Sequence, residues 1–137
     1  MGSLLLIDTS VAVALLVEDH TAHKTCRAAL TAHDLGLAGH ATFETLSVLS
    51  RLPAPHRRSV RAIYDAIDHS FPETRFLSEQ GTRAAAARMS ELGIGGGAVY
   101  DALVAVAAIE QGLPLVSRDQ RALQTYQAMG AELMLID

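Results

Sequence analysis

The chain has 137 residues, a net charge of −4 and a hydrophobic fraction of 50%, which predicts one domain with a substantial core. Its longest apolar runs, residues 11–17 and 102–109, fall well short of the roughly 20 residues that span a bilayer, and its first residues lack the basic start of a signal peptide. A single cysteine, Cys26, excludes an internal disulfide and a cysteine-rich zinc site, so we expect a cytoplasmic protein without membrane segments.

Short apolar runs alternate along the chain with longer stretches of helical spacing. The first helix is expected to be capped by Thr9 or Ser10, and Gly93 is a plausible residue just after a helix. Alternating strands and helices predict a parallel sheet of four to five strands covered by helices on both faces, which is a three-layer α/β/α sandwich, in one domain over residues 1–137. The predicted strands are residues 4–8, 35–39, 74–77, 113–117 and 131–136, and the predicted helices are 9–17, 20–33, 42–52, 60–67, 81–92, 98–109 and 119–129.

Four acidic residues are predicted to meet at one edge of this sheet. Asp8 ends the first strand, Glu44 and Asp101 lie in the first turns of two helices, and Asp119 starts the helix after the fourth strand. Helices of such a sheet run antiparallel to its strands, so strand C-termini and helix N-termini share the edge at which ligands bind.

Converging carboxylates repel one another unless a cation lies between them. Oxygen ligands without cysteine favour Mg²⁺ or Mn²⁺ over Zn²⁺. Removing the four acids would take the net charge from −4 to 0, so the acidity of the chain is concentrated in this set. The alternative for each acid taken alone is that it merely caps a helix.

Four blocks of sequence, "IDTS", "TFETLSVLSRL", "GGGAVYDALVAVAA" and "VSRDQRAL", occur in this order. With this spacing the whole chain resembles the PIN domain, most closely the VapC ribonuclease toxins of bacterial toxin–antitoxin pairs. The resemblance implies a PIN-like doubly wound α/β/α fold, a homodimer, and cleavage of tRNA or rRNA with Mg²⁺ or Mn²⁺. It makes the catalytic and metal-binding residues Asp8, Glu44, Asp101 and Asp119, with Ser10 and Ser117 beside the first and last acids.

We therefore expect a metal-dependent endoribonuclease inhibited by a cognate antitoxin. Its products should carry a 5′-phosphate and a 3′-hydroxyl, because water activated by the metal attacks instead of the ribose hydroxyl. Asp8 and Asp101 are the expected direct ligands, and Glu44 and Asp119 complete the shell. Because the family includes inactive members, the alternative is a catalytically silent PIN scaffold that binds RNA or a protein.

Basic residues gather between positions 51 and 61, beside a helical apolar stripe that ends at Ile67. They form either a solvated helix face or a contact surface for RNA or a partner protein. The resemblance places the antitoxin groove in this region, so we expect residues 42–67 to bind the antitoxin. The candidate contacts are Arg57, Arg58, Arg61, Tyr64 and Ile67.

Two further expectations concern the surface. Three Phe, three Tyr and no Trp predict little base stacking, so substrate choice should rest on shape and phosphate contacts. The helix over residues 98–109 is apolar all round, and part of that face, or of the run 11–17, is expected to be covered in a homodimer.

Overall fold

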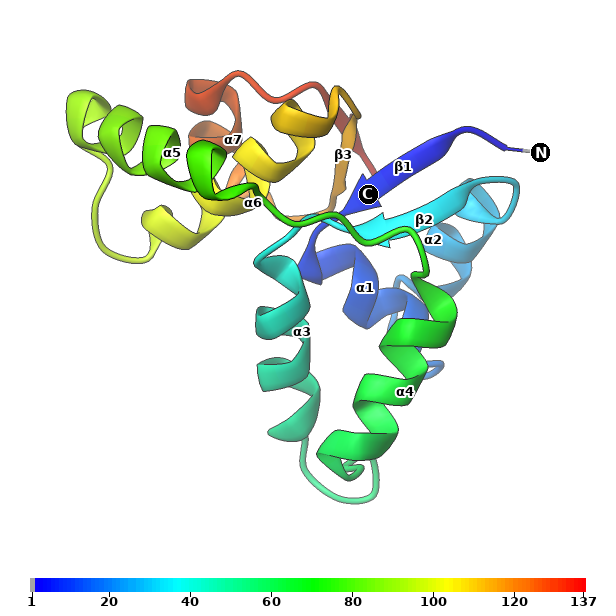
Figure 1. Ribbon diagram of the computed structural model, residues 1–137. Coiled ribbons are helices and arrows are strands. Elements are labelled where there is room, and N and C mark those ends of the chain that lie inside the picture. Colours follow the sequence, from blue (N-terminus) through cyan, green and yellow to red (C-terminus); the bar gives the residue numbers. More distant parts are fainter. Residues whose placement is uncertain (1) are drawn as a thin grey trace.

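The computed structural model describes residues 2–137 and has a parallel β-sheet at its centre (Figure 1). Within these residues the sheet has four strands in the order β2-β1-β3-β4, all parallel. β1 pairs with both β2 and β3, so it is a central strand, and its Leu5, Leu6 and Ile7 are buried. The strands are β1 Leu4–Ile7, β2 Asp34–Leu37, β3 Leu115–Ser117 and β4 Leu133–Leu135.

The helices form two packed groups with the sheet between them, which confirms the predicted three-layer α/β/α sandwich (Figure 1). In one group α1 contacts α2 and α3, and α3 contacts α4; in the other, α6 contacts α5 and α7. In residues 2–137 no helix is both long and apolar enough to cross a membrane. The helices are α1 Thr9–Leu16, α2 His23–Leu30, α3 Ala41–Ser50, α4 Val60–Ser70, α5 Glu79–Leu92, α6 Ala98–Gln111 and α7 Leu123–Met129.

The strand predicted at residues 74–77 is wrong, because the segment runs beside β2 but makes only one bridge, between Arg75 and Ala38. Around this bridge the Arg75 amide donates to Leu37 and its carbonyl accepts from Gly39. No second bridge forms, because the Leu37 amide donates to the Thr74 hydroxyl at 3.0 Å instead of to a backbone carbonyl, although the Glu73 amide still donates to the Leu35 carbonyl. A polar side chain thus replaces the backbone acceptor that a further bridge requires.

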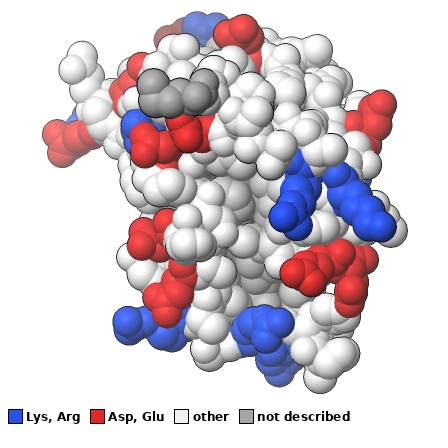
Figure 2. All heavy atoms as spheres, turned by 90° about the vertical axis from the view of Figure 1, so that its right-hand side faces the viewer, with Lys and Arg blue, Asp and Glu red and all other residues white. Residues whose placement is uncertain are grey.

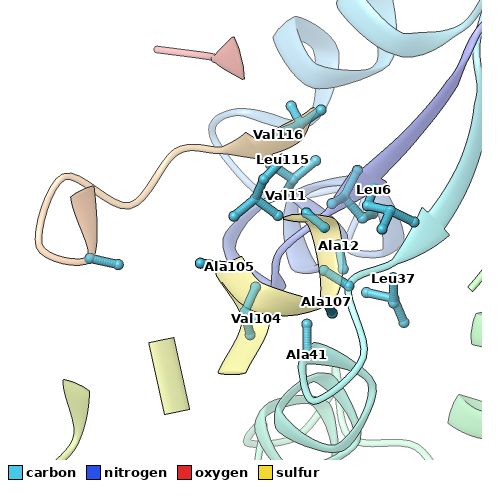
Figure 3. Packing of buried hydrophobic residues seen from close by; sticks show 14 of the residues in the cluster. Leu6, Val11, Ala12, Leu37, Ala41, Val104, Ala105, Ala107, Leu115 and Val116 are labelled. Carbon is cyan, nitrogen blue, oxygen red and sulfur yellow. The ribbon is translucent and has the colours of Figure 1, made fainter. Parts of the chain in front are cut away.

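One side of the apolar helix α6 is buried, whereas Ile109 near its end is 40% exposed. Ala105 and Ala107 lie among Leu6, Leu37 and Leu115 of the strands (Figure 3). Small side chains let the helix backbone approach the sheet closely, while the strands supply the larger residues that fill the interface. The first turn of α6 is thereby fixed at the edge of the sheet where β1 and β3 end.

Two helix starts differ from the predictions. Asp8, rather than Thr9 or Ser10, caps α1, because its side chain accepts a hydrogen bond from the Val11 amide. α7 begins at Leu123, so Asp119 lies in the preceding turn, where its carboxylate accepts from the Arg121 amide at 3.0 Å. The prediction that Gly93 follows the end of a helix is confirmed. It lies directly after α5 in the left-handed conformation, with φ of 68°.

Candidate active site

The four predicted acids lie at one edge of the sheet, from four separate elements. Asp8 follows β1, Glu44 and Asp101 lie in the first turns of α3 and α6, and Asp119 comes two residues after β3. The other three carboxylates all lie near enough to Glu44 to act on it electrostatically. The structure therefore brings the predicted set together.

Asp8 is buried, with 2% of its surface exposed, and is held by four donors. The Ser10 hydroxyl donates to Oδ1 at 2.6 Å, beside the Val11 amide at 3.2 Å. The Ser117 hydroxyl and the Tyr126 phenol donate to Oδ2 at 2.5 and 2.8 Å. These four bonds fix the orientation of the carboxylate and partly offset the cost of a charge in a place from which water is largely excluded.

Both predicted serines also accept hydrogen bonds from the turn after β3. Ser10 Oγ accepts from the Arg118 amide at 2.9 Å, and Ser117 Oγ accepts from the Asp119 amide at 3.0 Å. Each hydroxyl thus uses its proton on Asp8 and a lone pair on this turn. The serines connect the first acid to the last.

Asp101 and Asp119 share one cation, Arg121. The guanidinium makes a bidentate pair with Asp101 at 2.9 and 3.2 Å and reaches Asp119 at 3.0 Å. Asp101 is buried, whereas Arg121 leaves 68% of its side chain in solvent. The two carboxylates raise the pKa of Arg121 above its usual range, so this residue stays charged. Arg121 therefore supplies the positive charge that this part of the site requires.

Glu44 is the acid without a close donor. Its Oε1 is buried and has no hydrogen-bond partner among residues 2–137, and the imidazole nitrogen Nε2 of His40 lies 3.9 Å away. An oxygen in this situation loses the hydration that it would keep in solvent. Glu44 is thus the member of the set that most needs a further positive group.

Burial is the main cause of two raised pKa values in this site. It raises the pKa of Asp8, and the hydrogen bonds from Ser10, Ser117, Tyr126 and Val11 partly offset that rise. It also raises the pKa of Glu44, where the charges of Asp101 and Asp8 add to the rise and Arg121 opposes it. Raised carboxyl pKa values are the expected signature of like charges brought together out of water.

Within residues 2–137, no three His, Cys, Asp or Glu side chains are already arranged as a metal site. The reason lies in the pairing just described, since Asp8 is occupied by hydroxyls and Arg121 binds both Asp101 and Asp119. The donor set nevertheless fits a hard divalent cation, because it consists of carboxylate oxygens and includes the unpartnered Oε1 of Glu44.

Two residues of the site escape sequence reasoning. Tyr126 lies on the inner face of α7, where helical spacing marks it only as a core residue. Arg121 falls in a turn whose contacts with Asp101, twenty positions earlier, leave no local pattern. The one signal in the sequence is their proximity to Asp119, because Arg121 and Tyr126 follow it within seven positions.

The predicted contact region at residues 42–67 covers α3, the following loop and the first part of α4, and its candidate contacts on α4 divide between two faces of that helix. Tyr64 is exposed, but Ile67 is buried with 4% of its surface accessible, so the expectation that Ile67 contacts a partner is not met. Arg61 pairs with Asp65 at 3.3 Å, as expected for a solvated helix face. On the face drawn in Figure 2, basic side chains are separated by acidic ones instead of forming one basic field.

Comparison with known proteins gives one consistent family. A sequence model of the PIN domain matches residues 5–128. The chain is 40% identical over 131 residues to Ribonuclease VapC27 of Mycobacterium tuberculosis, with 96% of each chain covered. It is 37% identical over 130 residues to Ribonuclease VapC40 of the same species, covering 94% of this chain and 96% of the relative.

Solved structures share the fold at low sequence identity. The complex of VapBC2 from Rickettsia felis with a promoter DNA fragment has a chain that matches with a TM-score of 0.67 and 15% identity, over 100% of both chains. FitAcB from Neisseria gonorrhoeae gives 0.69 and 16%, over 96% of both chains. DNA-bound VapBC from Salmonella typhimurium gives 0.67 and 17%, over 98% of both chains.

The raised pKa of Glu44 predicts how one substitution changes stability with pH. Because the folded-state pKa lies above the ordinary 4.5, ionised Glu44 costs the fold stability, and this cost grows as the pH rises from 4.5 through the raised pKa. Glu44→Gln removes the charge, so in EDTA its melting temperature should exceed that of the unchanged protein by a few degrees at pH 7. The gain should shrink toward pH 4.5.

Thermal unfolding followed by circular dichroism measures this difference. Glu91→Gln, at an exposed position of α5, is the matched control and should show no gain. A gain for Glu44→Gln that is absent at pH 7, or that grows as the pH falls, would contradict the assignment of Glu44 to a crowded acidic site.

Proposed function

This chain belongs to the PIN-domain family and, within it, to the VapC ribonucleases, and from that premise we propose that it is an endoribonuclease toxin that depends on Mg²⁺ or Mn²⁺ and is inhibited by an antitoxin. The observation that carries the proposal is the meeting of four carboxylates at one edge of the sheet, with Asp8 held by four donors. An arrangement that costs electrostatic energy needs a functional explanation, and binding of a divalent cation is one.

The residues that would hold the cation are Asp8, Glu44, Asp101 and Asp119, and a bound cation would lower the pKa of a water molecule and neutralise charge on the phosphate. Asp8 presents a carboxylate whose orientation is fixed by Ser10, Ser117 and Tyr126. Glu44 adds a buried oxygen without a partner among residues 2–137. Arg121, released from Asp101 and Asp119, would be free to contact a phosphate oxygen.

The proposed products carry a 5′-phosphate and a 3′-hydroxyl, because water activated by the bound cation would attack the phosphate in place of the ribose 2′-hydroxyl. RNA reaches such an enzyme in the cytoplasm, which is where we place the protein. The four acids make hydrolysis more plausible than the catalytically silent scaffold, since a pure binding surface gains nothing from concentrated negative charge facing RNA.

The proposed antitoxin site is a groove of about 320 Å³ between the ends of α1 and α3 and one face of α4. Leu16, Leu49 and Ile63 line its floor, and Arg58 stands at its rim. A hydrophobic groove bordered by Arg58 and by the acids Glu18 and Asp19 suits an amphipathic helix that buries apolar anchors and pairs charged side chains of both signs with the rim. The groove overlaps the region 42–67 predicted from the sequence but also includes residues 16–19, and Ile63 rather than Ile67 lines it.

The central prediction is cleavage of single-stranded RNA that requires Mg²⁺ or Mn²⁺. Asp8→Asn and Asp101→Ala should each lower the rate on the order of a hundred-fold or more, because they remove charge from the reacting site. Incubation of labelled RNA with the purified protein, followed by sequencing of 5′ ends, measures both rate and product chemistry. Unchanged cleavage in EDTA, or full activity of both variants, would overturn the proposal.

The antitoxin groove predicts a separation of function. Ala66 is exposed and lines the groove, so Ala66→Trp should fill it while leaving the fold intact. We expect the affinity for the antitoxin to fall about ten-fold or more, with RNA cleavage by the free protein unchanged. Arg58→Ala should mainly slow association. Equal antitoxin affinity of Ala66→Trp and the unchanged protein, in a calorimetric titration, would place the partner elsewhere.

The proposed homodimer is tested by sedimentation velocity. The exposed apolar side chains on α5 and α6, Leu92 and Ile109, are candidates for its interface because a partner would cover them. We expect a dimer at micromolar concentration. A monomer over that whole range would count against the homodimer without affecting the proposed chemistry.

A further inference from the structure

Three rings from two distant parts of the sequence, residues 40–43 and residue 100, gather beside the acidic site. The rings of His40 and Tyr100 are stacked, with centroids 5.0 Å apart and planes 18° apart. Phe43 lies next to His40, at a centroid distance of 6.0 Å. Phe43 and Tyr100 are 56% and 51% exposed, which is unusual for large aromatic side chains that already have neighbours in a packed domain.

The same rings line a hollow that also contains part of the acidic site. This hollow has a volume of about 500 Å³ and is bordered by Phe43 and Tyr100 together with Glu44, Asp101 and Arg121. Arg51 also lines it and adds a second basic side chain. One continuous hollow therefore offers carboxylates, guanidinium groups and the faces of aromatic rings, in a volume typical of a small-ligand site.

The chain holds this aromatic hollow in a fixed geometry. Tyr100 lies in the first turn of α6, directly before Asp101, and Phe43 lies in the first turn of α3, directly before Glu44. Each exposed ring is thus one residue away from an acid of the site. Because both helices are packed in the core, the rings keep a constant relation to the carboxylates.

We infer that the aromatic hollow stacks an unpaired base of the RNA substrate beside the phosphate that is cut. This inference rests on the proposed ribonuclease function. Aromatic faces accept any base, and basic side chains such as Arg51 contact the backbone, which is the combination that single-stranded nucleic acid binding requires. A base inside a duplex cannot present its face, so the substrate class is a single-stranded segment or loop.

A second copy of the chain is the rival occupant of the aromatic hollow. The cores of interfaces between proteins are depleted of charged residues, whereas this hollow includes Glu44, Asp101, Arg51 and Arg121. Covering it with a protein surface would bury these charges and block access to the acids. A nucleotide instead supplies a phosphate for the basic side chains and an apolar face for the rings.

The experiment uses a short oligouridylate that carries a single 2-aminopurine, whose fluorescence falls when it stacks. Asp8→Asn with Mn²⁺ serves as the background, because it should bind this RNA without cutting it. We expect binding to quench the fluorescence. Adding Tyr100→Ala or Phe43→Ala should weaken binding about five-fold or more and remove the quenching, whereas Tyr100→Phe should retain both.

In the otherwise unchanged protein, Tyr100→Ala should raise KM with little change in kcat, as expected when an interaction with the bound substrate is lost. Leu135→Ala removes a comparably exposed apolar side chain on β4, outside every proposed site and interface, and should alter neither value. Absence of quenching in the background protein, or full quenching after Tyr100→Ala, overturns the inference.

Two outcomes separate this inference from its alternatives. If Tyr100→Ala converts a dimer into a monomer in sedimentation, a second copy occupies the hollow and the inference is wrong. If the unchanged protein cleaves RNA and Tyr100→Ala has no effect on KM, the proposed function stands and only the stacking fails. If the unchanged protein cuts no RNA while quenching persists, the proposed function fails and the binding surface remains.

Discussion

Mutual repulsion of four carboxylates is the constraint on which the rest of this structure depends. The fold brings Asp8, Glu44, Asp101 and Asp119 to one edge of the sheet, where burial raises the pKa of Asp8 and of Glu44. The chain offsets the repulsion in two ways. Hydroxyl groups donate to Asp8, and the guanidinium of Arg121 binds Asp101 and Asp119 together. Glu44 keeps a buried oxygen without a hydrogen bond from residues 2–137, and the charge of Arg121 only partly opposes the rise in its pKa. The four carboxylates therefore require positive charge near them, and Arg121 supplies only part of it.

The same contacts that organise the site also join the layers of the fold. Asp8 follows the central strand β1 and caps α1, while its other donors come from β3 and α7. The Ser10 and Ser117 hydroxyls extend these contacts to the turn that carries Asp119. Rigid elements thus fix the orientation of the carboxylate, as a preorganised site requires. Arg121 differs, because most of its side chain is in solvent and it can leave the carboxylates without disturbing the core.

Much of this arrangement could be predicted from the sequence, because it follows from topology. Once strands and helices alternate, the positions of Asp8, Glu44 and Asp101 at strand ends and helix starts place them at one edge. What could not be predicted depends on contacts between distant residues. Thr74 ends a strand that the apolar pattern favours, by offering its hydroxyl to the Leu37 amide. Ile67 belongs to an apolar stripe that divides between core and surface, and periodicity alone does not locate the dividing line.

The expectation of little base stacking, which follows from aromatic composition, stays untested. Six Phe and Tyr residues in 137 predict little stacking, yet the fold places Phe43 and Tyr100 beside the acids and against His40. Composition gives only the number of aromatic residues, whereas the ability of a ring to bind a ligand depends on its position in the fold and on the residues around it. The same holds for charge, since a net value of −4 does not reveal that four acids meet at one edge of the sheet, or that basic and acidic side chains are interspersed on the face drawn in Figure 2.

Calorimetric titration with Mn²⁺ of the protein, previously treated with EDTA, tests most directly whether the four carboxylates form a divalent cation site. We expect saturable binding, and tighter binding by Arg121→Gln, because that variant removes the guanidinium that competes for Asp101 and Asp119. Arg83→Gln removes an equal charge from the exposed face of α5 and should bind Mn²⁺ as the unchanged protein does. Lack of saturable binding by the unchanged protein, or weaker binding by Arg121→Gln, would contradict the account.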